Sequence, residues 1–551
     1  MTTTTTNPAA LAAALPASTF HTASIHLDGV HACLQDLGLS ENTPLPDLPM
    51  HFVLAGRPIP YTLMGVMERV YCLTNGLLAY DRTLDIVYHY EPRTGLWEAI
   101  TGDNRSAIVD DALQFLVEQE APLLTSSPAA QKAIDKLLNG PQGFHNSPAR
   151  YENTLRFLKN IRESRKCAAE DFDDYNELLH VGNGVINLST GELQPWSPDL
   201  FFRTGTQTLY EKGYRCEMFD SFIRHITAGG EDPAGKMEYL QRVSGISLTG
   251  HSKEKILVRL FDAHGDTGKT TFLEALSSCL GEYAQVVEPQ VVFGQSDSNN
   301  RTFAMSKLAG ARLVSMAETD SENSGFRLDA TAIKRFVGTD TQTARRPHES
   351  PFNFRPKYTA WVATNSDTKM SGGGDDAFWS RVKTIKFCNP IDKKDPAFIA
   401  AAQDPASPFV RAMLAWAVEG AAKYISQGLP PESVEITNAK AEYMRAVDPF
   451  ADFFDDFDFA PGNWISSSKI RALYLCHESV QDVRHPPSVE AMRKALSKKL
   501  QSKSESVRVD LEGGGKSEKP VRIWRGLCPK PHLLDGVTTE QIPTWGREKV
   551  K

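Results

Sequence analysis

The fold is decided by Ala263-His264-Gly265-Asp266-Thr267-Gly268-Lys269-Thr270, eight consecutive residues near the middle of the chain. An apolar run at 256–261 precedes this stretch, and a segment of helical character at 271–276 follows it. A strand, a glycine-containing loop and a helix in this order form a phosphate-binding loop, whose N–H groups face phosphate oxygens. We therefore predict nucleotide binding by Gly265, Asp266, Thr267, Gly268, Lys269, Thr270 and Thr271.

Two residues of this loop have specific expected roles. Lys269 is expected to reach the β- and γ-phosphates of ATP, and Thr270 to hold Mg²⁺. One position departs from the usual pattern, because Ala263 stands where the first glycine is normally found, while Gly265 adds a flexible point inside the loop. The alternative interpretation is a glycine-containing turn with an exposed lysine.

An acid follows the second apolar strand after the loop. This strand covers 312–317 and ends in Glu318. A carboxylate at such a strand end can polarise the water that attacks the γ-phosphate, or help to hold Mg²⁺. We predict catalytic and metal-binding roles for Glu318; the alternative is a carboxylate at the strand edge that only meets solvent.

Two further polar residues complete the expected catalytic set. A third strand at 358–364 ends in Asn365, which can contact the γ-phosphate and orient the water, although asparagine is also a common turn residue. Arg381 follows a glycine-rich loop at 371–374. An arginine supplied by a neighbouring subunit stabilises transition-state charge in related chemistry. The alternative for Arg381 is an ordinary surface or ion-paired arginine.

Positive charge is concentrated between Glu318 and Asn365. We expect a short helix from about 332, then a hairpin that turns near 347–350. A basic hairpin inside a ring can grip the backbone of a single nucleic-acid strand; the alternative is a solvated basic loop. The predicted DNA-binding residues of this segment are Lys334, Arg335, Arg345, Arg346 and His348.

Size and composition limit the class of protein. The chain has 551 residues, too many for one core, with 41% hydrophobic and 23% charged residues, as is ordinary for soluble proteins. The net charge of −8 argues against nucleic-acid coating over the whole surface but allows a local basic channel. No run of 18 apolar residues and no signal peptide occur, and the eight cysteines lack metal-ligand spacing. We therefore expect a cytoplasmic protein without a membrane span or zinc module.

The pattern along the chain predicts a multidomain α/β protein. Strands and helices alternate from 256 to about 390, which indicates an α/β core. A hairpin is expected at 81–100, mostly helix at 105–180, a turn-rich stretch at 181–191, and helices at 217–227, 235–246 and 407–447. The predicted domains are a disordered lead-in (1–47), an α+β N-terminal domain (48–245), the ATPase core with trailing helices (246–450), a basic domain (451–530) and a tail (531–551).

The basic domain is expected to resemble a winged helix. Helices are predicted at 466–480 and 488–501, followed by a hairpin at 507–525 around glycines 513–515. From 488 to 530 there are 11 Lys and Arg against 5 Asp and Glu. The second helix can enter the major groove of duplex DNA through Arg493, Lys494, Lys498 and Lys499. The alternatives are a solvated helix face or a protein-docking module.

Residues 183–448 resemble superfamily 3 helicases of the phage, plasmid and poxvirus primase-helicase group. Besides the loop, the matching motifs are Asn183 to Leu188, Thr190 to Leu193, Arg312 to Glu318, Ile333-Lys334, Gly338 to Asp340, Ala344-Arg345, Phe354 to Lys357, Thr364-Asn365, Trp379 to Arg381 and Ile385 to Phe387. The resemblance implies an AAA+-type ATPase that assembles as a homo-hexameric ring. It also implies ATP-driven 3′-to-5′ translocation on single-stranded DNA.

On that resemblance five residues take defined roles. Lys269, Thr270, Glu318, Asn365 and Arg381 correspond to the loop lysine, the Mg²⁺ ligand, the acid, the sensor and the arginine finger. Ala317 departs from the pattern, because related helicases often have a second acid there. Fewer than 200 residues precede Asn183, so a primase is expected to act in trans.

Three functions remain open from the sequence. The first is a ring helicase for replication of a phage, plasmid or integrated element. The second is a replication initiator that binds duplex DNA through the basic domain and melts it locally with ATP. The third is a P-loop NTPase or kinase without a role on DNA, which the basic segment at 334–346 disfavours. A role in genome defence is compatible with the same motifs.

Overall fold

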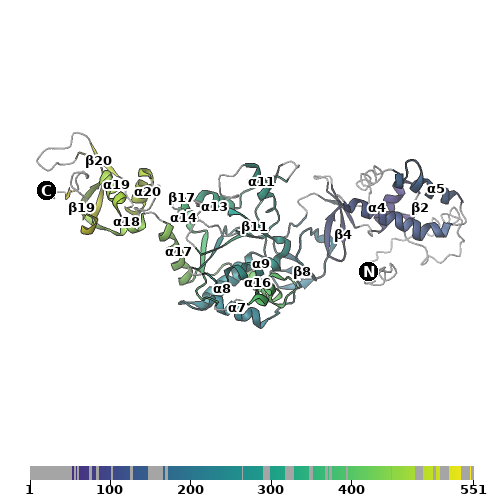
Figure 1. The fold of residues 1–551 in the computed structure, drawn as a ribbon, viewed down its shortest axis with the longest axis horizontal. Coiled ribbons are helices and arrows are strands. Elements are labelled where there is room, and N and C mark those ends of the chain that lie inside the picture. Colours follow the sequence, from purple (N-terminus) through teal and green to yellow (C-terminus); the bar gives the residue numbers. More distant parts are fainter. Residues whose placement is uncertain are drawn as a thin grey trace. The chain divides into compact units, whose positions relative to one another are not determined.

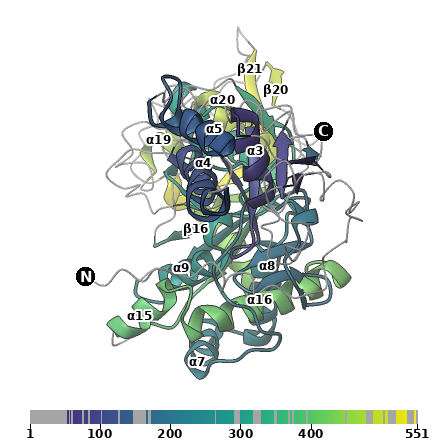
Figure 2. The same cartoon turned by 90° about the vertical axis from the view of Figure 1, so that its right-hand side faces the viewer.

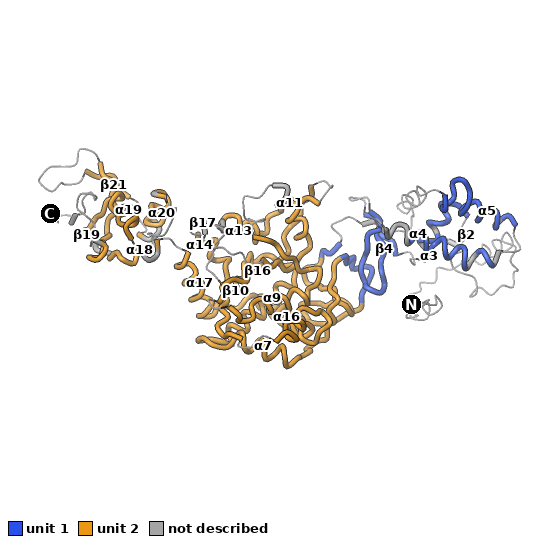
Figure 3. Tube along the Cα trace, in the orientation of Figure 1, with its two compact units in different colours: residues 1–174, 196–203 blue, residues 175–195, 204–551 orange. Residues whose placement is uncertain are grey.

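The structure is a computed structural model that falls into two compact units, 1–174 with 196–203, and 175–195 with 204–551 (Figure 3). The described residues are 53–54, 57–58, 61–73, 77–81, 86–100, 103–124, 128–146, 165–167, 172–262, 265–289, 298–316, 328–346, 351–365, 370–371, 375–391, 395–447, 450–477, 488–500, 504–508, 520–534 and 546–547. The expected lead-in at 1–47 and residues 147–164 of the mostly helical region expected at 105–180 lie outside these ranges.

The first unit combines a four-stranded sheet with helices. The sheet has the order β5-β4-β3-β6, and its hairpin of β4 and β5 confirms the hairpin predicted at 81–100. Trp97 is buried, stacks on Phe201 and donates from Nε1 to the Pro198 carbonyl at 3.0 Å. The elements are β1 (Val53–Leu54), β2 (Arg57–Pro58), α3 (Leu63–Leu73), β3 (Leu78–Asp81), β4 (Ile86–Glu91), β5 (Leu96–Ala99), α4 (Asp103–Phe115), α5 (Pro128–Asn139) and β6 (Arg165–Cys167).

The second unit is built on a five-stranded parallel sheet with the order β11-β12-β16-β10-β18. This sheet confirms the α/β core predicted from the alternation of strands and helices. β16 lies between β10 and β12 although it follows both in sequence, so the ends of these three strands are neighbours at one edge. The strands are β10 (Leu257–Phe261), β11 (Ala284–Val287), β12 (Leu313–Met316), β16 (Thr359–Thr364) and β18 (Val382–Lys386).

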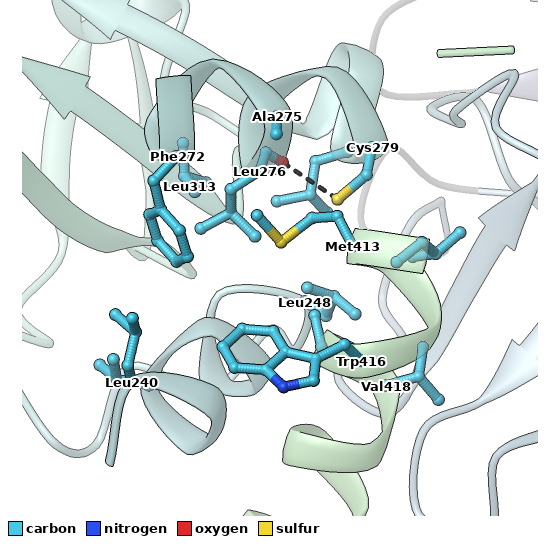
Figure 4. Close-up of a cluster of buried hydrophobic side chains, with 14 of the residues drawn as sticks. Leu240, Leu248, Phe272, Ala275, Leu276, Cys279, Leu313, Met413, Trp416 and Val418 are labelled. Carbon is cyan, nitrogen blue, oxygen red and sulfur yellow. Dashed lines mark hydrogen bonds between the residues drawn. The ribbon is translucent and has the colours of Figure 1, made fainter. Parts of the chain in front are cut away.

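Helices cover both faces of the sheet, as expected for parallel strands with apolar residues on both sides. On one face Val258, Leu313 and Trp361 pack with α7, α8, α9, α15 and α16. Figure 4 shows part of this layer, with Leu313 near Phe272 of α9 and Trp416 of α16. On the other, Val314 and Ala360 pack with α11, α13, α14 and α17. The helices are α7 (Glu217–Thr227), α8 (Pro233–Ile246), α9 (Lys269–Leu280), α11 (Ser298–Ser306), α13 (Ala330–Phe336), α14 (Asp376–Trp379), α15 (Pro396–Gln403), α16 (Pro408–Gln427) and α17 (Val434–Val447).

Local sequence signals set the ends of the longest helix, α16. The Ser407 hydroxyl accepts a hydrogen bond from the Val410 N–H at 3.1 Å, and Pro408 occupies the first helical position. The helix stops at Gly428, whose φ of +77° favours glycine. Its buried side packs along α8, and the two helices lie side by side in Figure 2. In Figure 1, α7, α8, α9 and α16 gather on one side of the unit.

The stretch predicted as turn-rich at 181–191 forms an antiparallel sheet of β7 (Leu178–Val181), β8 (Gly184–Asn187) and β9 (Glu192–Gln194). Asn183 lies in the turn between β7 and β8. Its side chain accepts from the Tyr210 N–H and donates to the Tyr210 carbonyl, both at 2.9 Å. This motif residue therefore joins the small sheet to the chain that leads into α7.

The C-terminal part of the chain contains the two predicted helices, α19 (Ser467–Cys476) and α20 (Val489–Leu500). The predicted hairpin forms from β20 (Glu505–Val507) and β21 (Val521–Pro529), and its turn at 513–515 lies outside the described residues. Three further elements were not expected from the sequence: α18 (Ala451–Asp455), β19 (Phe457–Ser466) and β22 (Gly546–Arg547). Of these, β19 pairs with β21. Within the ranges that the structure describes, no helix combines the length and apolar character that a bilayer span requires.

A buried arginine fixes the start of β12. The guanidinium group of Arg312 donates to the carbonyl groups of Leu248 at 2.6 Å, Leu178 at 2.7 Å and Tyr175 at 2.9 Å. It also lies over the ring of Tyr283, 4.6 Å from its centroid. One charged side chain therefore satisfies three backbone acceptors from two separate segments.

We predict that Arg312→Ala lowers the free energy of unfolding by about 3 kcal/mol, because it leaves one buried and two half-buried carbonyl groups without their donor. Urea titration followed by circular dichroism measures this change. The matched control is Arg224→Ala, since Arg224 lies on α7 with 63% of its side chain exposed; its effect should stay within about 0.5 kcal/mol. Equal effects of the two substitutions would contradict the assigned role of Arg312.

Candidate active site

The loop between β10 and α9 has the predicted order of strand, loop and helix. β10 ends at Phe261 and α9 begins at Lys269. Left-handed backbone occurs at Gly265 (φ +84°), Asp266 (φ +55°) and Gly268 (φ +90°). Position 263, where alanine replaces the usual glycine, lies outside the described residues.

Gly268 is required by space as well as by backbone conformation. A Cβ atom there would lie 2.8 Å from Cε2 of Phe222 and 3.2 Å from Cγ2 of Ile226. Both side chains belong to α7, which therefore packs directly against the loop. At this position the φ of +90° independently disfavours any other residue.

The ammonium group of Lys269 is held inside the protein by two side chains. It donates hydrogen bonds to the carboxylate of Asp262 and to the amide oxygen of Asn365. Lys269 is only 6% exposed and Asp262 only 5%. A buried ammonium group is stable only with such partners, so Lys269 forms part of a network and is not the exposed lysine of the alternative interpretation.

Asp262 receives further donors from the same loop. The Gly265 N–H and the Thr267 hydroxyl group both donate to its carboxylate. Burial alone would raise the pKa of Asp262, but the hydrogen bonds from Lys269, Thr267 and Gly265 outweigh it and hold the pKa below its ordinary value of 3.8. Asp262 is therefore an ionised carboxylate at neutral pH.

The sheet order explains how Asn365 reaches the loop. β16 pairs with β10 in parallel, with Thr364 opposite Phe261. Asn365 and Asp262 therefore follow neighbouring strands at the same edge. The structure therefore brings together Asn365 and Lys269, two of the residues that the sequence placed in the catalytic set.

The structure describes only some of the other residues that were predicted to bind nucleotide or metal. Thr270 is exposed and Thr271 partly exposed, both in the first turn of α9. Glu318 and Ala317 lie outside the described residues; β12, which precedes them, ends at Met316 next to β16. Among the side chains that the structure describes, no group of three or more His, Cys, Asp or Glu residues is arranged to hold a metal ion.

Arg381 lies at the opposite edge of the sheet from Lys269. It immediately precedes β18, and its carbonyl group accepts from the N–H of Leu257, the first residue of β10. Since β10 and β18 are parallel, Arg381 is at the amino edge, whereas the loop is at the carboxyl edge. Its guanidinium group donates to the Lys334 carbonyl at 2.5 Å. Within one chain, the structure does not bring Arg381 to Lys269.

The basic segment forms the expected short helix, α13, and hairpin, β14 (Gln342–Ala344) with β15 (Phe352–Phe354). Lys334 is ion-paired with Asp375 at 2.7 Å. This hydrogen bond from Lys334, followed by that from the Phe378 N–H, lowers the pKa of Asp375. Three further basic residues of the segment are exposed, while His348 lies outside the described residues; the exposed ones are Arg335, Arg345 and Arg346.

The basic helix α20 has both buried apolar and exposed basic side chains. Met492 and Leu496 are buried, whereas Lys494 is exposed and Arg493 partly exposed. The side chains of Lys498 and Lys499 lie outside what the structure describes. Of the two predicted duplex-DNA contacts whose side chains are described, Lys494 is therefore the more exposed.

Asp262 is the residue that the sequence analysis missed. It stands directly after the apolar run of β10 and one position before the loop pattern. A polar residue that ends a buried strand was the signal used for Glu318 and Asn365, and the same rule applied to β10 would have selected Asp262. The residues selected from the sequence lie instead within the loop or after it.

Two family models match parts of the chain. A model described as D5 N terminal like matches residues 76–228, and a family of unknown function (DUF5906) matches residues 261–381. The first match extends from unit 1 into unit 2. The second begins with the last residue of β10 and ends at Arg381, so it contains the loop, Asn365 and the basic segment.

Individual relatives are distant. A protein of Acanthamoeba polyphaga mimivirus named "Putative helicase" is 22% identical over 323 residues, which cover 55% of this chain and 33% of that protein. The chain thus spans one third of the length of the curated relative it matches. Together with the D5 N terminal like match, this relative supports the phage and viral primase-helicase group that the motifs resemble.

Solved structures with similarity to the chain include two of the NrS-1 C-terminal region in its apo form. The first has a TM-score of 0.44 and 10% sequence identity, and covers 83% of this chain and 98% of that chain. The second has a TM-score of 0.43 and 8% identity, with coverages of 84% and 99%.

We predict that Gly268→Ala destabilises the protein more than Gly310→Ala. Both glycines have positive φ, but an added Cβ at Gly310 meets nothing within 4 Å, whereas at Gly268 it meets Phe222. Gly310→Ala should cost about 1 kcal/mol through backbone strain alone, and Gly268→Ala about 2 to 4 kcal/mol. Urea unfolding of both variants measures the difference, and equal losses would show that α7 does not constrain the loop.

Proposed function

We propose that the protein is an ATP-dependent DNA helicase that acts in the replication of a phage, plasmid or integrated element. One observation carries the proposal: Lys269, at the start of α9, is bonded to side chains that follow two adjacent parallel strands, Asp262 and Asn365. This arrangement supports the interpretation of the loop as a phosphate-binding loop, with Asn365 as the neighbouring sensor. Similarity to a viral protein named as a helicase supports the same function.

The donor set of the loop fits a phosphate group. The Gly265 N–H, the Thr267 hydroxyl and the Lys269 ammonium group already converge on an anion, the Asp262 carboxylate. In the proposed ATPase, Lys269 neutralises charge on the β- and γ-phosphates, and Asn365 and Glu318 orient and polarise the attacking water. Thr270 would hold Mg²⁺, which when bound neutralises charge on the phosphates; its hydroxyl is accessible at the first turn of α9.

The position of Arg381 supports an assembly with shared sites. It lies at the sheet edge opposite the loop, so as an arginine finger it would act on a nucleotide held by another copy of the chain. Repeated contacts between opposite edges of identical copies form a closed ring when the rotation allows it. We propose a homo-hexamer with single-stranded DNA in its channel, translocation from 3′ to 5′, and a primase acting in trans.

The basic surfaces would contact the DNA. Arg335, Arg345 and Arg346 are exposed on α13 and next to the hairpin, where they can neutralise phosphates of a single strand. In the C-terminal part, α19, α20 and the hairpin of β20 and β21 follow in the order of a winged helix, with Lys494 exposed on α20. That arrangement favours duplex DNA binding and makes an origin-binding initiator the second candidate function.

We predict that Lys269→Ala reduces DNA-stimulated ATP hydrolysis by about 10² to 10³, because transition-state charge loses its cationic partner. Phosphate release with and without single-stranded DNA measures the rate, and unwinding of a tailed duplex should be lost in parallel. Lys212→Ala is the matched control, since Lys212 has 57% of its side chain exposed. A wild-type ATPase rate that DNA does not change, without unwinding, would contradict the helicase.

We predict that Lys269→Ala and Arg381→Ala subunits complement each other when mixed. If Arg381 acts on the neighbouring site, random 1:1 mixing places an intact Lys269 opposite an intact Arg381 at about a quarter of the interfaces. ATP hydrolysis should then exceed that of either variant alone. The mass of the assembly with ATP and DNA confirms that mixed oligomers form. Mixed oligomers without regained activity would contradict an arginine supplied in trans.

A further inference from the structure

We propose that Asp262 is a built-in phosphate mimic, whose carboxylate occupies the phosphate-binding groups of the loop and must leave them when a nucleotide binds. The inference rests on the proposed nucleotide-binding function and adds a regulatory residue to that site. Asp262 would set how readily the loop accepts a phosphate, so it acts as an autoinhibitory group and not as a catalytic one.

The first support is the convergence of donors on one carboxylate. A backbone N–H (Gly265), a hydroxyl (Thr267) and an ammonium group (Lys269) all donate to Asp262. These are the kinds of donor with which a loop of this type holds phosphate oxygens. A carboxylate offers two anionic oxygens to the same donors, so it satisfies the loop in the way that a phosphate would.

The second support is burial. The Asp262 side chain is 3% exposed and that of Lys269 6%, so solvent has little access to either charged group. A phosphate that approached Lys269 would meet the negative charge of Asp262 at close range, in surroundings that screen charge poorly. Both anions cannot share these donors, and nucleotide binding therefore requires the carboxylate to move away.

The third support is the second partner of Lys269. Asn365 also accepts a hydrogen bond from the ammonium group, so Lys269 keeps one neutral partner when Asp262 leaves. The N–H of Asp262 is hydrogen-bonded to the Thr364 carbonyl at 3.4 Å. We therefore expect the exchange to occur by rotation of the Asp262 side chain, without a shift of the strand that precedes it.

A different role for Asp262 makes the opposite prediction. Ala317 stands where related helicases often have a second acid, and the alternative role for Asp262 is to replace that acid as a ligand of Mg²⁺. In that case loss of the carboxylate would weaken nucleotide binding and would do so only when Mg²⁺ is present. The phosphate mimic predicts tighter binding, and predicts it without Mg²⁺.

The test compares Asp262→Asn with the wild-type chain by isothermal titration with pyrophosphate and with ATP, each in EDTA and in Mg²⁺. Asp262→Asn keeps the shape of the side chain and removes its charge. We expect both ligands to bind at least about tenfold more tightly in EDTA. The control is Glu217→Gln on α7, which removes one negative charge from a side chain that is 83% exposed; its affinities should equal those of the wild type.

Thermal unfolding provides a second readout. The ligand-free Asp262→Asn protein should melt at a lower temperature than the wild type, because Lys269 loses its charged partner, yet show the larger upward shift on adding pyrophosphate. Asp262→Ser, with a shorter polar side chain, should behave in the same way if Asp262→Asn is too unstable for titration. Unchanged or weaker binding by the variants, with normal binding by the wild type, overturns the inference alone. Absence of ATP binding by wild type and variants overturns the proposed function as well.

Discussion

The buried ammonium group of Lys269 is the constraint on which the rest of the core depends. Such a charge is tolerated inside a protein only when hydrogen-bonded partners surround it. One partner, Asp262, comes from the end of β10, and the other, Asn365, from the end of β16. Both can reach Lys269 only because these strands are neighbours, with the Phe261 and Thr364 positions paired. The hydrogen bonds that hold Lys269 in the loop therefore depend on the order of the strands in the sheet.

The packing of helix α7, which precedes the sheet in sequence, also constrains the loop. Phe222 and Ile226 of α7 leave no room for a side chain at Gly268, so a segment far upstream shapes the loop. α7 is in turn held by the apolar layer that includes α8, α9 and α16. Because both faces of the parallel sheet are covered, a shift of one strand by a single residue would move each of its side chains into the apolar layer on the opposite face, which is packed for a different side chain. The loop geometry is thus protected by packing on several sides.

Local features of the fold could be predicted from the sequence, and pairings between distant segments could not. The strand before Lys269, the strand before Asn365, the helix at 217–227 and the hairpin after α13 all have local signals of periodicity or turn chemistry. The position of β16 between β10 and β12, and the three carbonyl groups bound by Arg312, depend on contacts between segments far apart in sequence. β19 was missed because Pro461 and Gly462 interrupt its pattern.

The residues with proposed catalytic roles lie at two opposite edges of the sheet. The loop and Asn365 lie at the carboxyl edge, whereas Arg381 lies at the amino edge, beside the first residue of β10. The same arginine is hydrogen-bonded to the carbonyl group of Lys334, in the helix that leads into the basic hairpin. In the proposed ring, this hydrogen bond would place the segment proposed to contact DNA in one subunit next to the arginine that it offers to its neighbour's site.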